Sequence, residues 1–264
     1  MHTTHHCSPE KPPEQTQVLQ RLTRDIQQLE TSHRRHQEPQ ALSTGCQPLD
    51  ECLPQKGYLP GSVVEYLRLT PACGATQLAL AAASEALQDK QRFLVVIDTQ
   101  HRIYPPALAS RGIDLKQVIL VRPESRADAL WAADQALRTS AVAAVVAEFD
   151  RIDDRAARRL QLAAEIGGGI ALLLRSATAR HQPSWAEVQW LVRSASSSNR
   201  RLQVQLARVR GGKAGAIVGL QIDSGTGKIS AIEKRRGVSP LPANILPASI
   251  QPATPARRAR PLAG

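Results

Sequence analysis

The chain has 264 residues, of which 42% are hydrophobic and 3% aromatic, so it is long enough to bury one sizeable core. Its 34 basic and 23 acidic residues give a net charge of +11, which favours a polyanionic partner such as nucleic acid. Its apolar runs are too short to span a bilayer, and residues 1–13 lack the apolar segment of a signal peptide, so a cytoplasmic protein is expected.

The first part of the chain is predicted to contain a tail and a helix. Residues 1–13 combine proline with polar side chains, which favours a disordered tail. Residues 14–36 are predicted to form an amphipathic helix with one narrow apolar face. The apolar positions are Val18, Leu19, Leu22, Ile26 and Leu29. This face can dock on the rest of the chain or bind another protein, and the pattern leaves both open.

The cysteines have neither the Cys-x-x-Cys spacing of a zinc site nor the density of a disulfide scaffold, so they are expected to be free thiols. They are Cys7, Cys46, Cys52 and Cys73. Residues 2–7 also contain three histidines, but a tail has no preorganised ligand geometry. No metal site is therefore predicted.

From Ser62 onward, buried apolar runs alternate with helical patterns, which predicts a parallel sheet with helical crossovers. The predicted strands span residues 63–66, 93–97, 118–121, 142–147 and 170–174. The predicted helices span residues 77–87, 127–138 and 153–166. The fold class is therefore α/β, with a mostly parallel sheet flanked by helices.

The pattern then changes to short strands separated by Gly and Ser turns, which predicts antiparallel additions at the sheet edge. These strands span residues 190–193, 202–209, 216–222 and 228–232. Residues 41–236 are thus predicted to be one core domain. Residues 237–264 are rich in Pro, Ala and Arg and are predicted to be a disordered basic tail, because no acidic residue follows Glu233.

Three segments, in this order, resemble the core of bacterial RecA. Residues 43–50 (Ser-Thr-Gly-Cys-Gln-Pro-Leu-Asp) and 57–65 (Gly-Tyr-Leu-Pro-Gly-Ser-Val-Val-Glu) resemble the approach to that family's phosphate loop. Residues 93–101, with Arg-Gly-Ile-Asp at 111–114, resemble the strand that ends in the catalytic glutamate. Residues 127–148 resemble the helix and strand that carry the metal-linked aspartate.

Within this superfamily the chain most resembles ImuA-type proteins, through its short core, its Ala-rich loop and Arg210-Gly211-Gly212 after a late strand. The resemblance implies a RecA-like P-loop NTPase core and an accessory role in DNA repair, the SOS response and translesion synthesis. It also implies two partners, a polymerase-like protein and an error-prone replicative polymerase.

The phosphate loop departs from the working pattern G-x-x-x-x-G-K-[ST], in which the lysine neutralises the β/γ-phosphates. The matching residues are Leu69, Thr70, Pro71, Ala72, Cys73, Gly74, Ala75 and Thr76. Leu69 thus replaces the first glycine and Ala75 replaces the lysine. Free amides of the helix that begins near Thr76 can still attract an anion, so weak binding of ATP and magnesium stays open, with no cofactor required. Turnover is not expected, because each positioned charge contributes around 10²-fold or more to phosphoryl transfer.

Two further positions to which the resemblance assigns roles have changed. Gln100 stands where the family has its water-activating glutamate, and an amide cannot accept a proton. Glu148 stands at the position of the metal-linked aspartate, with Asp150 as a stand-in. We interpret Glu148 as a solvated strand end, with a metal contact as the alternative, and Asp98 as a loop or helix cap. The chain is thus predicted to be a pseudo-ATPase without catalytic residues.

Two glycine-rich strings are interpreted as turns. Gly225-Thr-Gly-Lys228 lies between two predicted strands and lacks the spacing of a phosphate loop, so residues 224–227 are predicted to form a hairpin turn. Gly167-Gly168-Gly169 is interpreted as a turn from helix to strand.

The RecA resemblance places DNA contacts on two loops, which here are the short stretches 150–153 and 175–184. Trp185 and Trp190 near the second loop are interpreted as core or interface residues. Non-specific, salt-sensitive phosphate contact and a solubilising fringe are alternative roles for the basic residues. The candidate DNA contacts, besides the basic tail, are Arg175, Arg180, Arg208 and Arg210.

The leading hypothesis is a non-hydrolysing accessory protein that acts as an interaction scaffold. One alternative is a divergent ATPase that recruits Arg68, Lys90 or Lys116 in place of the loop lysine. Arg68 is favoured among these because it adjoins the loop. Another alternative is a regulator of cell division or of RecA. No residue in the sequence distinguishes this alternative from the leading hypothesis.

Overall fold

The structure is a computed structural model that describes residues 40–70, 72–88, 90–195, 201–223 and 226–232. Contacts within the chain separate residues 1–40 from residues 41–264, and the sheet described below belongs to the second unit. The predicted tails and N-terminal helix, at residues 1–13, 14–36 and 237–264, lie outside the described residues and stay predictions. In the described part of the chain, no helix is both long enough and apolar enough to cross a membrane.

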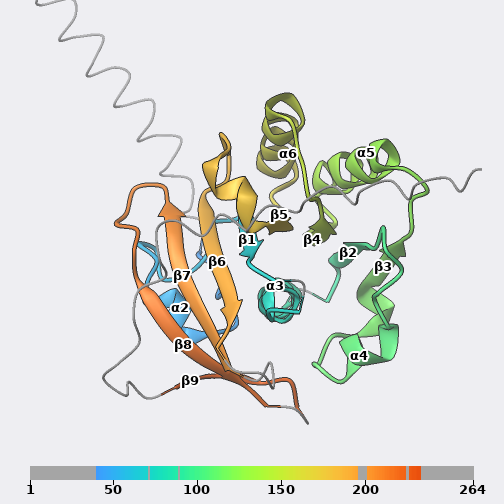
Figure 1. The fold of residues 1–264 in the computed structure, drawn as a ribbon. Helices are drawn as coiled ribbons and strands as arrows, with labels where there is room; N and C mark the ends of the chain where they lie inside the picture. The colour runs from blue at the N-terminus through green and yellow to red at the C-terminus, as the bar shows by residue number, and fades with distance from the viewer. Residues whose placement is uncertain (1–39, 71, 89, 196–200, 224–225, 233–264) are drawn as a thin grey trace, which may run out of the picture. The chain divides into compact units, whose positions relative to one another are not determined.

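A nine-stranded sheet has the order β3-β2-β4-β5-β1-β6-β7-β8-β9. The strands are β1 (Val63–Arg68), β2 (Phe93–Ile97), β3 (Val118–Val121), β4 (Val142–Glu148), β5 (Ile170–Ser176), β6 (Val188–Ser194), β7 (Arg201–Val209), β8 (Ile217–Ile222) and β9 (Ile229–Ala231). The helices are α2 (Gln47–Asp50), α3 (Ala75–Ala86), α4 (Pro105–Ala109), α5 (Arg126–Leu137) and α6 (Asp154–Gly167), with short 3-10 helices η1 (Leu115–Gln117) and η2 (Ala177–His181). Figure 1 shows α5 and α6 over one face of the sheet and α3 over the other.

The predicted α/β fold with a mostly parallel sheet is confirmed, but one strand direction was wrong. From β3 to β6 in the sheet order all strands are parallel, and β7, β8 and β9 are antiparallel additions. We expected β6 to be antiparallel, whereas it pairs in parallel with β1. Residues 177–187 form the crossover that parallel pairing requires, and a short apolar run has the same pattern in either direction.

Capping residues set the bounds of the two helices that follow β3 and β4. Ser125 and Asp153 stand at the N-caps of α5 and α6, and each side chain accepts a hydrogen bond from a backbone N–H in the first turn. Gly168 ends α6 with φ of 70°, a conformation that glycine adopts without strain. The turn predicted at Gly167-Gly168-Gly169 is therefore confirmed. Sequence reasoning missed the short helices α2 and α4, which carry proline in their first turns.

Apolar residues fill both faces of the sheet. Val64 and Tyr66 of β1 pack on the side of α3, and Val95 and Val145 pack on the side of α5 and α6. The alanines of α3 let the helix backbone approach the sheet closely, and Ala79 and Ala83 are fully buried. This packing brings the start of α3 against the end of β1, where the phosphate loop lies.

Two further predictions are confirmed among the described residues. Cys46, Cys52 and Cys73 are free thiols, while Cys7 lies outside the described residues. The strands β8 and β9 pair antiparallel, with Ile222 opposite Ile229. The Gly-Thr-Gly-Lys string therefore falls between two antiparallel strands and is not a phosphate loop, while residues 224 and 225 of the predicted turn lie outside the described residues.

Candidate functional site

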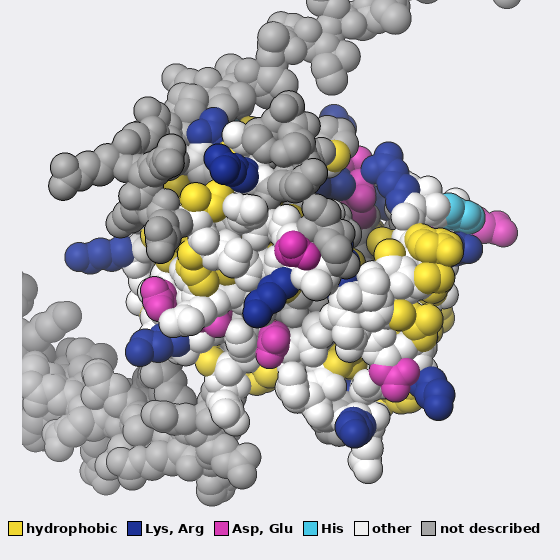
Figure 2. Space-filling view, turned by 90° about the horizontal axis from the view of Figure 1, so that it is seen from below, with side chains coloured by type: hydrophobic (Ala, Val, Ile, Leu, Met, Phe, Trp, Pro, Cys, Tyr) yellow, Lys and Arg dark blue, Asp and Glu magenta, His cyan; other side chains and the backbone are white. Residues whose placement is uncertain are grey.

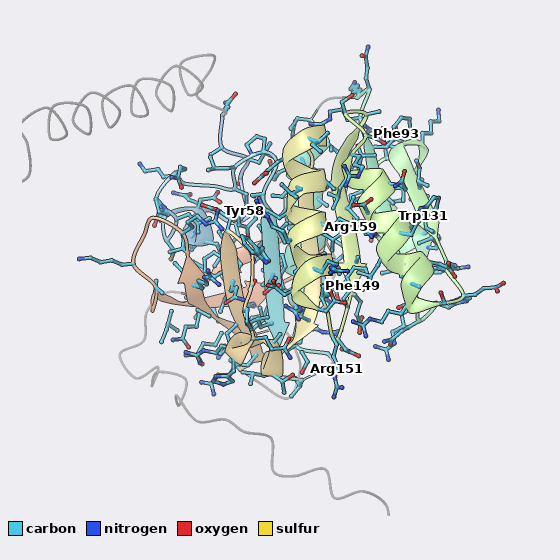
Figure 3. The ribbon with its side chains drawn as sticks, turned by 90° about the horizontal axis from the view of Figure 1, so that it is seen from above. Tyr58, Phe93, Trp131, Phe149, Arg151 and Arg159 are labelled. Carbon is cyan, nitrogen blue, oxygen red and sulfur yellow. The ribbon has the colours of Figure 1, made fainter. Side chains whose placement is uncertain are left out.

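The altered phosphate loop, residues 69–76, connects the end of β1 to the start of α3. Because β1, β2 and β4 are parallel, the residues that follow these strands meet at one edge of the sheet. Figure 3 views the sheet from the side of α5 and α6, with Phe149 and Arg151 marking this edge. The candidate site is therefore built from the carboxyl ends of the three strands.

An apolar side chain of β7 packs against the phosphate loop. Gly74 is the N-cap of α3 and has φ of 89°. A Cβ atom on Gly74 would lie 2.6 Å from Cδ2 of Leu202, at the start of β7. Ala75, at the lysine position, is buried, and burial raises the pKa of the buried Cys73 thiol. The second half of the loop is thus packed into the apolar core.

The remaining loop residues contribute no charge. The backbone N–H of Leu69 donates to the carbonyl oxygen of Val192 at 3.1 Å, which fixes the loop to β6. Thr70 and Ala72 are exposed, and Thr76 is half-buried. Pro71 lies outside the described residues.

An ion pair joins the ends of β1 and β4. Nη2 of Arg68 lies 2.5 Å from Oε1 of Glu148 and 3.6 Å from Oδ1 of Asp150. Nε2 of Gln100 donates to the same Oε1 of Glu148 at 3.2 Å. The side chains of Arg68 and Glu148 are only 12% and 19% exposed. The interpretation of Glu148 as a solvated strand end is therefore wrong, because its carboxylate accepts from an arginine and an amide.

Asp98 caps the loop that follows β2, as predicted. Its Oδ1 accepts from the backbone N–H of Arg102 at 2.9 Å, and its Oδ2 accepts from that of Ile103 at 3.0 Å. Arg122 lies 3.7 Å from the same carboxylate. The side chain of Asp98 is buried, and its hydrogen bonds are made within the protein.

The other two cations considered in place of the loop lysine are at the wrong end of the sheet. Lys90 is exposed and precedes β2, and Lys116 lies in η1, which precedes β3. Residues that precede parallel strands lie at the amino edge, opposite the loop. Of the three candidates only Arg68 lies near the loop, and its guanidinium is engaged with Glu148 and Asp150.

Comparison with known proteins places this geometry in a family. The model of the RecA N-terminal domain matches residues 22–181, which is more than half of the chain. The chain belongs to the RecA N-terminal domain family. Protein ImuA of Caulobacter vibrioides is 32% identical over 142 residues, covering 50% of this chain and 56% of ImuA. Protein RecA of Prochlorococcus marinus is 34% identical over 109 residues, covering 41% of this chain and 28% of RecA.

These matches have a limited extent. The chain spans about half the length of the ImuA relatives that it matches, and less than that of RecA. The crystal structure of the RadB recombinase superposes with a TM-score of 0.58 at 19% identity, covering 73% of this chain and 100% of RadB. This likeness to RadB shows the shared RecA-type fold.

The two loops that the RecA resemblance links to DNA are short and tied to the domain. After β4, α6 begins at Asp154, which leaves residues 149–153 as the first loop. The second loop contains η2 and is followed by Trp185, whose Nε1 donates to Oδ1 of Asp154 at 2.9 Å. The guanidinium carbon of Arg158 lies 4.4 Å from the ring centroid of Trp185. Trp190, in contrast, is a fully buried core residue, as predicted.

Arg175 cannot contact DNA, contrary to the prediction. It is 1% exposed, and its Nη1 lies 2.7 Å from Oε1 of Glu65. Its Nη2 donates to Oε1 of Gln182 at 3.0 Å, and Gln189 donates to the other oxygen of Glu65 at 2.7 Å. The side chain is buried on one face of the sheet, where Glu65 of the paired strand β1 supplies the matching charge.

The other candidate DNA contacts lie at the surface but are partly engaged. Arg208 donates to the carbonyl oxygen of Ser184 at 2.9 Å, and Arg210 lies 3.5 Å from Glu187. Arg180 is half-buried in η2. On the face drawn in Figure 2, basic and acidic side chains of the described residues are interspersed. The basic side chains of the described residues therefore do not form a continuous positive surface on that face.

A cavity of about 410 Å³ adjoins Gln100 and Glu148. Its walls come from the ends of β2 and β4 and from the turn between β3 and α5, including Arg126 and Phe149. Sequence reasoning did not select this turn, although the Ser-x-x-Asp string at Ser125 marks the start of a helix. It also missed Leu202, for which the loop sequence carries no signal.

Proposed function

We propose that this chain is an accessory protein of DNA damage repair and translesion synthesis that does not hydrolyse ATP. Similarity to ImuA and membership of the RecA N-terminal domain family support the biological role. The engagement of Arg68 with Glu148 supports the lack of hydrolysis, because Arg68, the candidate cation that adjoins the loop, is committed to a protein carboxylate.

The residues at the site do not fit a magnesium nucleotide. The lysine position holds the buried Ala75, and the position of the water-activating residue holds Gln100. Leu202 packs on Gly74, at the start of α3. Loss of one positioned donor lowers phosphoryl or acyl transfer by about 10²-fold or more, and here two independent roles are lost. A pseudo-ATPase is the function that this chemistry supports best.

The proposed role is that of an interaction scaffold. By similarity to ImuA, its partners are a polymerase-like protein and an error-prone replicative polymerase. Exposed apolar side chains on the described surface include Trp131 of α5 and Ile166 of α6, which are 62% and 67% exposed. Such side chains are candidate anchors for a protein partner.

DNA contact is part of the proposal in a limited form. Arg180, Arg208 and Arg210 are the candidate contacts that reach the surface. Because two of them already bond within the protein, we propose non-specific and salt-sensitive binding, to which the basic tail contributes.

Two alternatives remain distinguishable from this proposal. A divergent ATPase would use Arg68 as its loop cation, and it would have to release Arg68 from Glu148 and Asp150 first. A regulator of cell division or of RecA would act through protein contact alone, without translesion polymerases.

The test is to measure ATP binding, ATP hydrolysis and complex formation on the same full-length preparation. The expected result is copurification with the polymerase-like protein and a hydrolysis rate at background, with or without a DNA oligonucleotide. Hydrolysis that disappears in Arg68→Ala would establish the divergent ATPase instead. Copurification with RecA, and not with the polymerase-like protein, would favour the regulator.

A further inference from the structure

The ion pair between Arg68 and Glu148 crosses an intervening strand. In the sheet order, β5 lies between β4 and β1. Neighbouring strands are about 4.8 Å apart, so the strand axes of β1 and β4 are separated by roughly 10 Å. A long side chain is needed to span this gap, and that of Arg68 does so with an N–O distance of 2.5 Å. The ion pair thus holds together two strand ends that flank the nucleotide position of the family.

Arg68 supplies positive charge to two carboxylates at the end of β4. Glu148 and Asp150 both follow from the end of β4, and both approach the same guanidinium nitrogen. A working phosphate loop has a lysine and a magnesium ion near these positions, and both carry positive charge. This chain has Ala75 at the lysine position. The positive charge near the two carboxylates comes instead from Arg68, the last residue of β1.

The identity of residue 100 is consistent with this arrangement. Gln100 donates its amide to the oxygen of Glu148 that also accepts from Arg68. A glutamate at this position would place a second carboxylate within hydrogen-bond distance of the first, and like charges at that distance disfavour ionisation. A neutral amide instead adds a donor to the ion pair.

We infer that Arg68 is a built-in counter-ion, which ties the ends of β1 and β4 together without nucleotide and suppresses binding of a divalent cation by Glu148 and Asp150. The inference goes beyond the proposed accessory role, because it states what balances the charge of these strand ends in the absence of a ligand. It does not depend on which partner the protein binds.

The first experiment titrates Mn²⁺ into full-length protein by isothermal titration calorimetry, without nucleotide. The wild type is expected to show no saturable binding. Arg68→Ala frees the two carboxylates and is expected to bind Mn²⁺ at one site, with a melting temperature that rises by about 3–5 °C at tenfold the dissociation constant. Arg68→Lys keeps the positive charge and should bind at least tenfold more weakly than Arg68→Ala.

Two variants serve as controls. Arg122→Ala removes another arginine at the same edge, but Asp98 keeps its two backbone N–H donors, so no Mn²⁺ site is expected. Arg68→Ala combined with Glu148→Gln should lose the Mn²⁺ site again. Mn²⁺ binding by the wild type that equals that of Arg68→Ala would overturn the inference, as would a folded Arg68→Ala that does not bind.

A reciprocal variant covers the case in which Arg68→Ala does not fold. Glu148→Gln with Asp150→Asn leaves Arg68 without either carboxylate, and inorganic pyrophosphate should then raise the melting temperature, whereas the wild type should not respond. A response of equal size in the wild type, or none in the variant, would contradict the counter-ion role. Because these titrations contain no nucleotide or partner, they can fail independently of the proposed function.

Discussion

Arg175 and Glu65 form an ion pair across the strands β5 and β1, with 2.7 Å between Nη1 and Oε1 and with both side chains at most 3% exposed. A guanidinium at this depth is stable only with a matched carboxylate, because a buried unpaired charge is strongly unfavourable. Arg175, which we predicted to contact DNA, is therefore part of the protein interior.

Removing one partner of this pair should be strongly destabilising. Arg175→Met leaves Glu65 buried with Gln189 as its remaining donor, and it should lower the free energy of unfolding by about 3–5 kcal/mol. The double variant Glu65→Leu with Arg175→Met removes both charges and should recover most of that loss. Urea denaturation followed by circular dichroism measures both, and a single variant as stable as the wild type would contradict the assignment.

Gly74 should not tolerate a side chain. A Cβ atom would meet Leu202 and would also force φ of 89° on an L-residue, so Gly74→Ala should lose about 2–4 kcal/mol in thermal or urea unfolding. Gly168→Ala is the matched control, because φ is 70° there but no atom lies within 4 Å of the added Cβ. It should lose only about 1–2 kcal/mol. Equal losses for both variants would show that Leu202 does not restrict the loop.

Cys46 should ionise only at high pH. Burial raises the pKa of its thiol to about 11, above the ordinary value of 9.0. At pH 9 its thiolate fraction is then about fiftyfold below that of an unperturbed cysteine, and iodoacetamide should label it correspondingly slowly. Because the pKa is raised in the folded state, the associated stability is present below pH 9 and is lost as pH rises towards 11. Mass spectrometry measures the labelling of each cysteine in native and in urea-unfolded protein, and the two labelling rates of Cys46 are then compared.

Glu187 should make stability decrease with pH across the carboxylate range. Burial raises the pKa of Glu187, and the nearby Arg210 and Arg208 lower it, with burial the larger effect. A raised pKa in the folded state gives stability at acidic pH that is lost as pH rises through that value. Glu187→Gln should therefore gain stability relative to the wild type between pH 4 and pH 7. Glu124→Gln, at an exposed position, is the control and should show no such trend.

DNA affinity, where present, should depend on the surface arginines. Replacing Arg180, Arg208 and Arg210 with glutamine should reduce the slope of log affinity against log salt by about 2, since each single-strand phosphate contact contributes about 0.7. Fluorescence anisotropy with a labelled oligonucleotide measures this slope. The charge-matched control replaces Lys56, Lys90 and Lys116, which are exposed, with glutamine. An equal change in the control would assign the effect to net charge alone.

Local patterns determined much of the fold. The bounds of β2 and β3 match the predicted strands at residues 93–97 and 118–121, because a contiguous apolar run between turns records burial directly. The predicted helices at 127–138 and 153–166 were each within one residue of α5 and α6 at both ends. The loss of the loop lysine was also visible in the sequence, since it is a matter of residue identity at Ala75.

Only the tertiary structure decided the pairings between distant segments. The direction of β6, the position of Leu202 on Gly74 and the inward orientation of Arg175 all depend on which strands become neighbours. The pair of Arg68 with Glu148 joins residues 80 positions apart, and no local pattern contains that relation. The sequence by itself therefore determined that the phosphate-binding residues are lost. The fold determined that an internal ion pair stands beside their positions, because side chains from separate strands meet only when the sheet has formed.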